Sequence, residues 1–172
     1  MEIEIDVQAC FELPATRHAA CLEILDRISE QTWQTWFRTW LPALNSALPA
    51  AQTYELSLRL TDDDQMQTLN QSYRQQNRPT DVLAFAALEA EFPHAAQMPL
   101  YLGDIVISVE TAIRQAQQQQ HSETVELAWL ATHGLLHLLG WDHPDDDSLQ
   151  EMLDRQTALL QLVGLDSPDR WA

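Results

Sequence analysis

The histidine-rich stretch at residues 128–147, AWLATHGLLHLLGWDHPDDD, constrains this chain more than any other segment. His133 and His137 are four residues apart in a helical pattern, so both imidazoles are expected on one face of a helix. Gly140 predicts the end of that helix, because glycine adopts the left-handed conformation of a helix C-terminus without a Cβ clash. The chain can then turn and bring His143 back towards the same point.

Three converging neutral imidazoles form a good ligand set for a divalent transition metal, zinc above all. The sequence offers no obvious fourth ligand, and an open fourth position distinguishes catalytic zinc sites from structural ones. A lone histidine on an apolar helix is usually a packed core residue, but three at this spacing are much harder to explain by packing. We therefore predict one zinc ion per chain, held by His133, His137 and His143.

The spacing H-x-x-x-H-x-x-G-x-x-H is also the metal-binding spacing of the metzincin proteases. Those proteases carry a glutamate directly after the first histidine, where it acts as the general base. This chain has Gly134 at that position, and glycine can do no acid–base chemistry. The sequence therefore predicts the metal scaffold without the peptidase base.

The charge of the chain limits its partners. Its formal net charge is −17, and its nine basic residues are all arginines. Such a charge repels polyanions at long range and counts against broad, nonspecific nucleic-acid binding, which depends on many phosphate contacts. A small local basic groove is still compatible with it, and Arg59, Arg74 and Arg78 lie close enough in sequence to form one.

Length and composition predict a single domain over residues 1–172. The opening residues are acidic and lack the basic region of a signal peptide, and no apolar run approaches the roughly 18 residues that span a bilayer. Two cysteines, Cys10 and Cys21, favour free thiols in a reducing compartment, although they could instead complete a closed structural zinc site. We expect a cytoplasmic protein with no membrane partner.

Hydrophobic periodicity predicts strands and helices in alternation. Strands are expected at residues 2–7, 54–60, 80–86 and 100–108. Helices are expected at residues 19–30, 33–48, 62–74, 109–120 and 146–163, and across the histidine segment after a cap at Ser122. This order predicts an α+β single domain: a small mixed β-sheet with helices packed on it, and a metal site on a late helix and the turn after it.

Several segments have competing interpretations. The tryptophan stripe of residues 33–48, which Pro42 should bend or divide, is more typical of core than of base stacking. The acidic run at residues 62–64 suits a helix N-terminus better than a metal site. His18, His94 and His121 are interpreted as surface or loop histidines, residues 87–99 as a loop, and residues 164–172 as a loose tail.

Three separated segments resemble the YbeY family of metal-dependent endoribonucleases, which mature ribosomal RNA. They are NQSYRQQNRPTDVLAF at 70–85, LGDIVIS at 102–108 and HGLLHLLGWDH at 133–143. The last matches the family signature H-G-x-L-H-L-x-G-x-D-H, and the order and spacing of the other two agree with it. Residues 8–50 are not diagnostic. One departure is Ala84, where the family usually has serine, so any contribution of that hydroxyl to substrate is absent here.

The resemblance implies an α+β fold, a zinc held by the three histidines, and a nearby functional arginine that matches Arg74. It also implies cleavage of single-stranded RNA, maturation of the 3′ end of small-subunit ribosomal RNA, and a role in ribosome quality control. The implied partners are ribosomal RNA, the small ribosomal subunit and its associated proteins.

These observations together predict metal-assisted phosphodiester hydrolysis. The predicted catalytic residues are Arg74, His133, His137 and His143, and the predicted substrate-binding residues are Arg59, Arg74 and Arg78. The general base stays open among Asp142, Asp104 and Asp81. Two other functions also stay open: a metal-dependent hydrolase of another substrate, and a ribosome-associated assembly factor whose metal is mainly structural.

Overall fold

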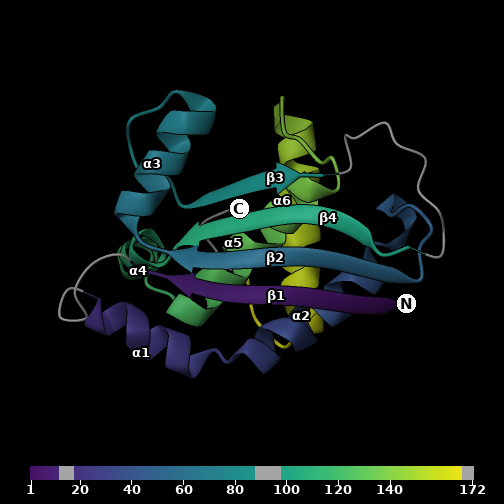
Figure 1. Ribbon diagram of the computed structural model, residues 1–172, viewed down its shortest axis with the longest axis horizontal. Helices are drawn as coiled ribbons and strands as arrows, with labels where there is room; N and C mark the ends of the chain where they lie inside the picture. Colours follow the sequence, from purple (N-terminus) through teal and green to yellow (C-terminus); the bar gives the residue numbers. More distant parts are fainter. Residues whose placement is uncertain (12–17, 88–97, 168–172) are drawn as a thin grey trace.

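A computed structural model describes residues 1–11, 18–87 and 98–167. Its four strands form one sheet in the order β1-β2-β4-β3, with β1 and β3 at the two edges (Figure 1). The strands are β1 (Glu2–Cys10), β2 (Thr53–Thr61), β3 (Val82–Ala86) and β4 (Leu100–Ser108). β1, β2 and β4 run parallel, whereas β3 is antiparallel to β4, so the predicted small mixed sheet is confirmed.

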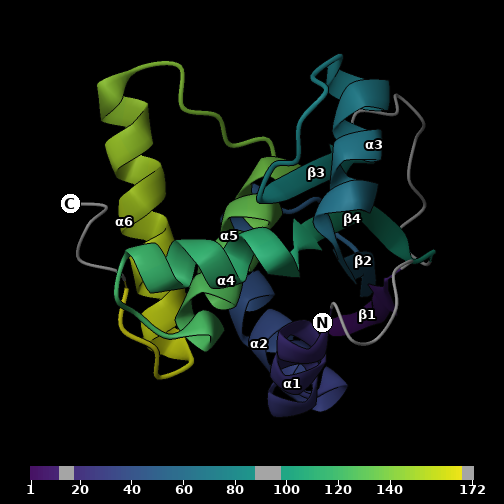
Figure 2. The same ribbon diagram turned by 90° about the vertical axis from the view of Figure 1, so that its left-hand side faces the viewer.

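Helices cover both faces of the sheet unequally. They are α1 (Ala19–Arg27), α2 (Glu30–Ala43), α3 (Asp63–Arg74), α4 (Val109–Gln118), α5 (Glu123–Leu138) and α6 (Asp146–Leu162). Helix α3 lies on one side of the sheet, and α5 and α6 lie on the other (Figure 2). None of the described helices is long and apolar enough to cross a lipid bilayer.

The main core lies between the sheet and the helices on the α5 side. Alternate residues of β2, Leu56, Leu58 and Leu60, point into it because side chains alternate between the two faces of a strand. The tryptophan stripe of α2 is buried in this core, as predicted, and Trp40 Nε1 donates a hydrogen bond to the carbonyl of Leu159 at 2.9 Å. A second, smaller cluster lies under α3 on the opposite face: Met66, Leu83 and Val106.

Several predicted element boundaries differ from the structure by a few residues, and two of the differences have a clear cause. Strand β1 continues to Cys10 rather than ending at residue 7, because every residue from Glu2 onward pairs with β2 in parallel register. Helix α2 ends at Ala43, and a 3₁₀ turn, Asn45–Ala47, replaces the predicted continuation to residue 48. Pro42 lies in the last turn of α2, where proline disfavours further helix.

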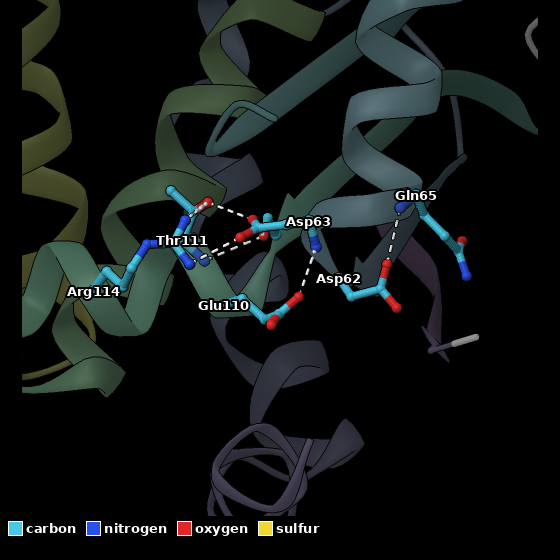
Figure 3. Close-up of polar contacts among 7 residues, drawn as sticks. Asp62, Asp63, Gln65, Glu110, Thr111 and Arg114 are labelled. Carbon is cyan, nitrogen blue, oxygen red and sulfur yellow. Dashed lines mark hydrogen bonds and ion pairs between the residues drawn. The ribbon is translucent and has the colours of Figure 1, made fainter. Parts of the chain in front are cut away.

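The acidic run caps a helix, as predicted (Figure 3). Asp62 Oδ1 accepts the backbone N–H of Gln65 at 2.9 Å and so caps α3. Asp63 accepts hydrogen bonds from the hydroxyls of Ser108 and Thr111, each at 2.6 Å, and pairs with Arg114 at 2.8 Å. These contacts fasten the start of α3 to the start of α4.

One interpretation of the histidines was wrong. His18 is only 1% exposed: its ring packs against Phe11 at 5.1 Å, and its Nε2 lies 3.5 Å from Asp62 Oδ2. It is buried because the end of β1 and the start of α1 meet the start of α3, a contact that no local pattern reveals. His121 lies in a loop beside the buried Glu126. His94, residues 88–97 of the predicted loop and residues 168–172 of the predicted tail lie outside the described residues.

A β-bulge in β4 brings strand β3 and helix α5 close together. The register with β2 shifts there, so that Glu55 pairs with Tyr101 but Leu56 pairs with Gly103. Gly103 has a φ of +135°, and a Cβ on it would lie 2.2 Å from the carbonyl oxygen of Phe85 and 2.9 Å from Leu138 Cδ2. Only glycine meets both the backbone and the space requirement at this position.

We expect Gly103→Ala to lower the free energy of unfolding by at least about 3 kcal/mol, because the new methyl group meets backbone as well as requiring positive φ. Gly164→Ala is the matched control, since Gly164 also has positive φ, at +78°, but a Cβ added there would have nothing within 4 Å. Its cost should be about 1 kcal/mol. Urea denaturation of both variants measures the difference, and equal losses would contradict a steric role for Gly103.

Candidate metal centre

Helix α5 carries the first two histidines and ends where the sequence predicted. Ser122 Oγ caps its start by accepting the backbone N–H of Val125 at 3.1 Å. At its end, the N–H of Gly140 bonds to the carbonyl of His137 at 3.1 Å, and the N–H of Trp141 bonds to that of Leu136 at 3.0 Å. With a φ of +91° at Gly140, this is a Schellman-type termination, and the chain reverses direction after it.

The three histidines converge, as their spacing predicted. One ring nitrogen from each of His133, His137 and His143 lies within 4.8 Å of the other two. The Nε2 atoms of His133 and His137 are 3.0 Å apart. In a tetrahedral zinc site with Zn–N bonds of about 2.0–2.1 Å, neighbouring ligand nitrogens lie about 3.3 Å apart. The donor set and its spacing therefore fit a divalent transition metal with small adjustments.

A buried glutamine orients His133. Gln156 on α6 donates from Nε2 to the carbonyl of Trp129 at 3.1 Å, which fixes the orientation of its amide. Its Oε1 then faces His133 Nδ1 at 3.3 Å, so Nδ1 carries the proton and Nε2 is left unprotonated towards the other histidines. Sequence reasoning missed this role, although a polar residue within the apolar stripe of α6 was a visible signal.

Burial keeps the helical imidazoles neutral. Burial first, and then the neighbouring His137, lower the pKa of His133 from 6.5 to about 4. The pKa of His137 is also lowered, first by burial and then by His143. Neutral imidazole is the form that binds a metal, so both side chains are ready for coordination at neutral pH.

The histidines open into a cavity of about 710 Å³. Its other lining residues come from β3 and the turn before it, from α3 and α5, and from the turn after α5: residues 80–86, Arg74, Gly134 and Asp142. Arg74 reaches this cavity from the last turn of α3. Ala84 lies in the cavity lining, so the serine that the family usually carries would be placed at the site itself.

Gly134 lies at a close contact between helix and sheet. A Cβ there would lie 2.8 Å from Ile105 Cγ2 and 3.4 Å from Val82 Cγ2. A glutamate side chain cannot occupy this position without separating α5 from β3 and β4. Packing therefore explains why the glutamate of the peptidases is absent at position 134, because this fold leaves no room there for the side chain of a metzincin general base.

The other candidate site residues lie in different places. Asp81 and Asp142 line the histidine cavity, whereas Asp104 lines a separate cavity on the α3 side of the sheet. Arg59 also lines that second cavity. Arg78 bonds through Nε and Nη2 to Gln76 Oε1, at 3.2 and 2.9 Å. Arg59 and Arg74 therefore line different cavities, although their closeness in sequence suggested one shared groove.

The cysteines lie outside this centre. Cys10 and Cys21 are free, and neither belongs to the histidine cluster, the one group with metal-binding geometry among the described residues. Burial, followed by the nearby Glu110, raises the pKa of the Cys21 thiol to about 11. A thiol with so high a pKa stays protonated at neutral pH and is a poor metal ligand.

Comparison with known proteins identifies the family. The family model described as Endoribonuclease YbeY matches residues 22–164. This chain belongs to the YbeY endoribonuclease family. It is 56% identical over 169 residues to Endoribonuclease YbeY of Trichormus variabilis, a match covering 96% of each chain. The corresponding protein of Nostoc sp. is 55% identical, over 96% of this chain and 92% of that protein.

A solved structure shares the fold of this chain. The solution structure of TM1509 from Thermotoga maritima matches 92% of this chain and 88% of its own with a TM-score of 0.55, at 22% sequence identity. The similarity at this level concerns the fold alone, and it agrees with the predicted α+β architecture. The predicted membership of the YbeY family is confirmed, and the chain is an enzyme of this nuclease family.

Burial of His133 predicts a pH-dependent stability for the metal-free protein. The unfolded chain takes up a proton near pH 6.5, but the folded protein resists it until about pH 4. This stabilisation is therefore complete above pH 6.5 and is lost as the pH falls towards 4, by about 3 kcal/mol in total. Urea denaturation of chelator-treated protein across this range measures the loss. His133→Asn should show a shallower loss, and an unchanged slope would contradict the assignment.

Gln156 should control how tightly the centre holds a metal. We expect Gln156→Met to weaken zinc affinity by about 10- to 100-fold, because His133 loses its orienting acceptor. Gln156→Glu should strengthen binding, since a carboxylate makes the imidazole a better donor. Competition with a chromophoric chelator measures both affinities directly. Equal affinity in all three proteins would show that Gln156 only joins α5 to α6.

Proposed function

We propose that this chain is a zinc-dependent endoribonuclease that cuts single-stranded RNA, with ribosomal RNA as its substrate. The observation that supports this most is the convergence of three histidine side chains with Arg74 in one open cavity of a YbeY-family protein. We place its action at the 3′ end of small-subunit ribosomal RNA and in ribosome quality control, in the cytoplasm and with the small subunit as partner.

His133, His137 and His143 would hold the ion, most simply zinc given three nitrogen ligands and an open side. When bound, the ion supplies Lewis-acid chemistry by drawing charge from a phosphoryl oxygen or a water molecule. Gln156 holds His133 in the tautomer that this binding requires.

Arg74 would bind the phosphate at the bond to be cut. Its guanidinium is always charged and can donate to two phosphate oxygens side by side. Its closeness to the centre is visible in its electrostatic effect on His137, whose pKa is lowered by burial first and by Arg74 among the weaker causes. A positive charge here is most useful as negative charge develops on the phosphate during the reaction.

Two carboxylates line the cavity and can accept a proton. Asp81 uses both oxygens in contacts, with the N–H of Val82 at 2.8 Å and with Gln115 Nε2 at 3.3 Å. Asp142 uses Oδ1 to accept the backbone N–H of His143 at 2.8 Å. We assign Asp142 as the proton acceptor, because its contacts among the described residues leave more of the carboxylate available.

The deciding experiment compares cleavage of a single-stranded RNA by the wild type and His143→Ala, with zinc added to both. His143 is exposed, so its loss should remove a ligand and leave the fold intact. We expect activity to fall by at least about 100-fold in His143→Ala and similarly in Arg74→Gln. Arg27→Gln is the matched control for Arg74, since Arg27 is an exposed arginine at the end of α1 that pairs with Glu23. Equal cleavage by all the proteins would assign the activity to a contaminant.

One observation favours a second function, that of a ribosome-associated assembly factor. The β1 edge of the open sheet face carries exposed Glu2, Glu4 and Asp6, a surface suited to a basic protein partner. Binding would then not depend on the metal ligands. This function would be supported over the nuclease if the wild type cuts no RNA and if the wild type and His143→Ala bind small subunits equally well.

A further inference from the structure

A second cavity adjoins the metal centre across the edge strand. It measures about 510 Å³ and lies between α3 and the open face of the sheet. Phe85, on β3, lines both this cavity and the histidine cavity. The two hollows are therefore neighbours that share Phe85 as a wall, and a flexible chain bound in one can pass over this residue towards the other.

The last turn of α3 forms the other side of this junction. Arg74 lines the histidine cavity, and the preceding residue, Tyr73, lines the second one. Consecutive helical residues point about 100° apart, so two neighbours can serve two adjacent hollows. Tyr73 and Phe85 are in edge-to-face contact, with ring centroids 5.0 Å apart. We call this pair the aromatic ledge.

Tyr73 is unusually exposed for an aromatic side chain. It is 64% accessible although its ring is held against Phe85. A large aromatic ring that is fixed in place but open to solvent is a typical platform for an unstacked nucleobase of single-stranded RNA. Such stacking is worth about 1–3 kcal/mol per base and tolerates any base sequence.

The charges around the junction favour different positions for the phosphate and for the base of a nucleotide. Arg74 attracts phosphate on the metal side. On the ledge side, Asp104 pairs with Phe85 across β3 and β4 and accepts a hydrogen bond from Tyr101 at 2.5 Å. Asp6 and Arg59 lie in the same cavity. The two carboxylates outnumber the one guanidinium there, so they disfavour phosphates but do not repel a neutral base, and the sugar–phosphate chain is expected on the Arg74 side.

We propose that the aromatic ledge is a nucleobase subsite, in which Tyr73 stacks on the base of a nucleotide next to the phosphate bound by Arg74. This inference rests on the proposed RNA substrate and adds to it the residue that positions the strand. It also gives a highly acidic protein a way to hold RNA without many phosphate contacts, since stacking is largely independent of net charge.

The first test uses a set of single-stranded 12-nucleotide RNAs, each with one abasic position. In the wild type, one abasic position next to the cut bond should lower kcat/KM by about tenfold. In Tyr73→Leu the intact RNA should lose a similar factor, mainly through KM, and the abasic position should have no further effect. Tyr73→Phe should restore the positional effect, because it keeps the ring. Leu162→Ala, at another exposed apolar residue, is the control for nonspecific loss.

A second test does not need catalysis. Chelator-treated protein is titrated into the same RNA carrying one 2-aminopurine, whose fluorescence is quenched when it stacks on an aromatic ring. Quenching by the wild type and Tyr73→Phe but not by Tyr73→Leu supports the ledge even if no bond is ever cut, in which case only the nuclease function fails. Equal quenching by all three proteins, no saturable binding by the wild type, or an abasic effect that persists in Tyr73→Leu would overturn it.

Discussion

The close contact of helix α5 with strands β3 and β4 determines where the candidate metal centre lies relative to the sheet. Two glycines permit it: Gly134 on the helix leaves room for Ile105, and Gly103 at the bulge of β4 leaves room for the carbonyl of Phe85 and the side chain of Leu138. Because of this contact, His133 and His137 lie beside the edge of the sheet rather than deep beneath it. The edge strand β3 then becomes a wall of their cavity.

The same contact explains why the chain shares a ligand spacing with peptidases but not their base. The residue after the first histidine is used for packing, so no acid–base group fits there. Acid–base chemistry has to come from elsewhere, and the carboxylates that the fold brings to the cavity are Asp81 and Asp142. A metal-ligand motif thus specifies where an ion can bind, whereas the packing around it limits which chemistry follows.

Charge is organised locally in this acidic protein. Next to the histidine cavity, burial keeps two imidazoles uncharged, and Arg74 supplies positive charge at the opening. At the start of α3, burial would raise the pKa of Asp63, but hydrogen bonds from Ser108 and Thr111 and the pairing with Arg114 lower it overall. Asp63 therefore stays charged and holds α3 against α4, which helps to position the far end of α3, where Tyr73 and Arg74 lie.

Local patterns were sufficient for much of the fold. Helical spacing predicted the buried tryptophan stripe, an acidic run predicted the cap of α3, and Gly140 predicted the end of α5. These features depend on neighbours within a few residues, so the chain encodes them directly. The burial of His18 could not be predicted in this way, because its surroundings come from segments far apart in sequence.

The sequence by itself determined the candidate ligand set: three histidines, their helical spacing and the glycine that turns the chain between them. It also determined the family, because the motifs that identify the family can be recognised in the sequence without a structure. Only the tertiary structure decided which other residues join those histidines. It placed Gln156 behind His133, brought Arg74 to the cavity and separated Asp104 and Arg59 from it. The physical reason is that these contacts depend on strand register and on helix packing across the sheet, which no short stretch of sequence contains.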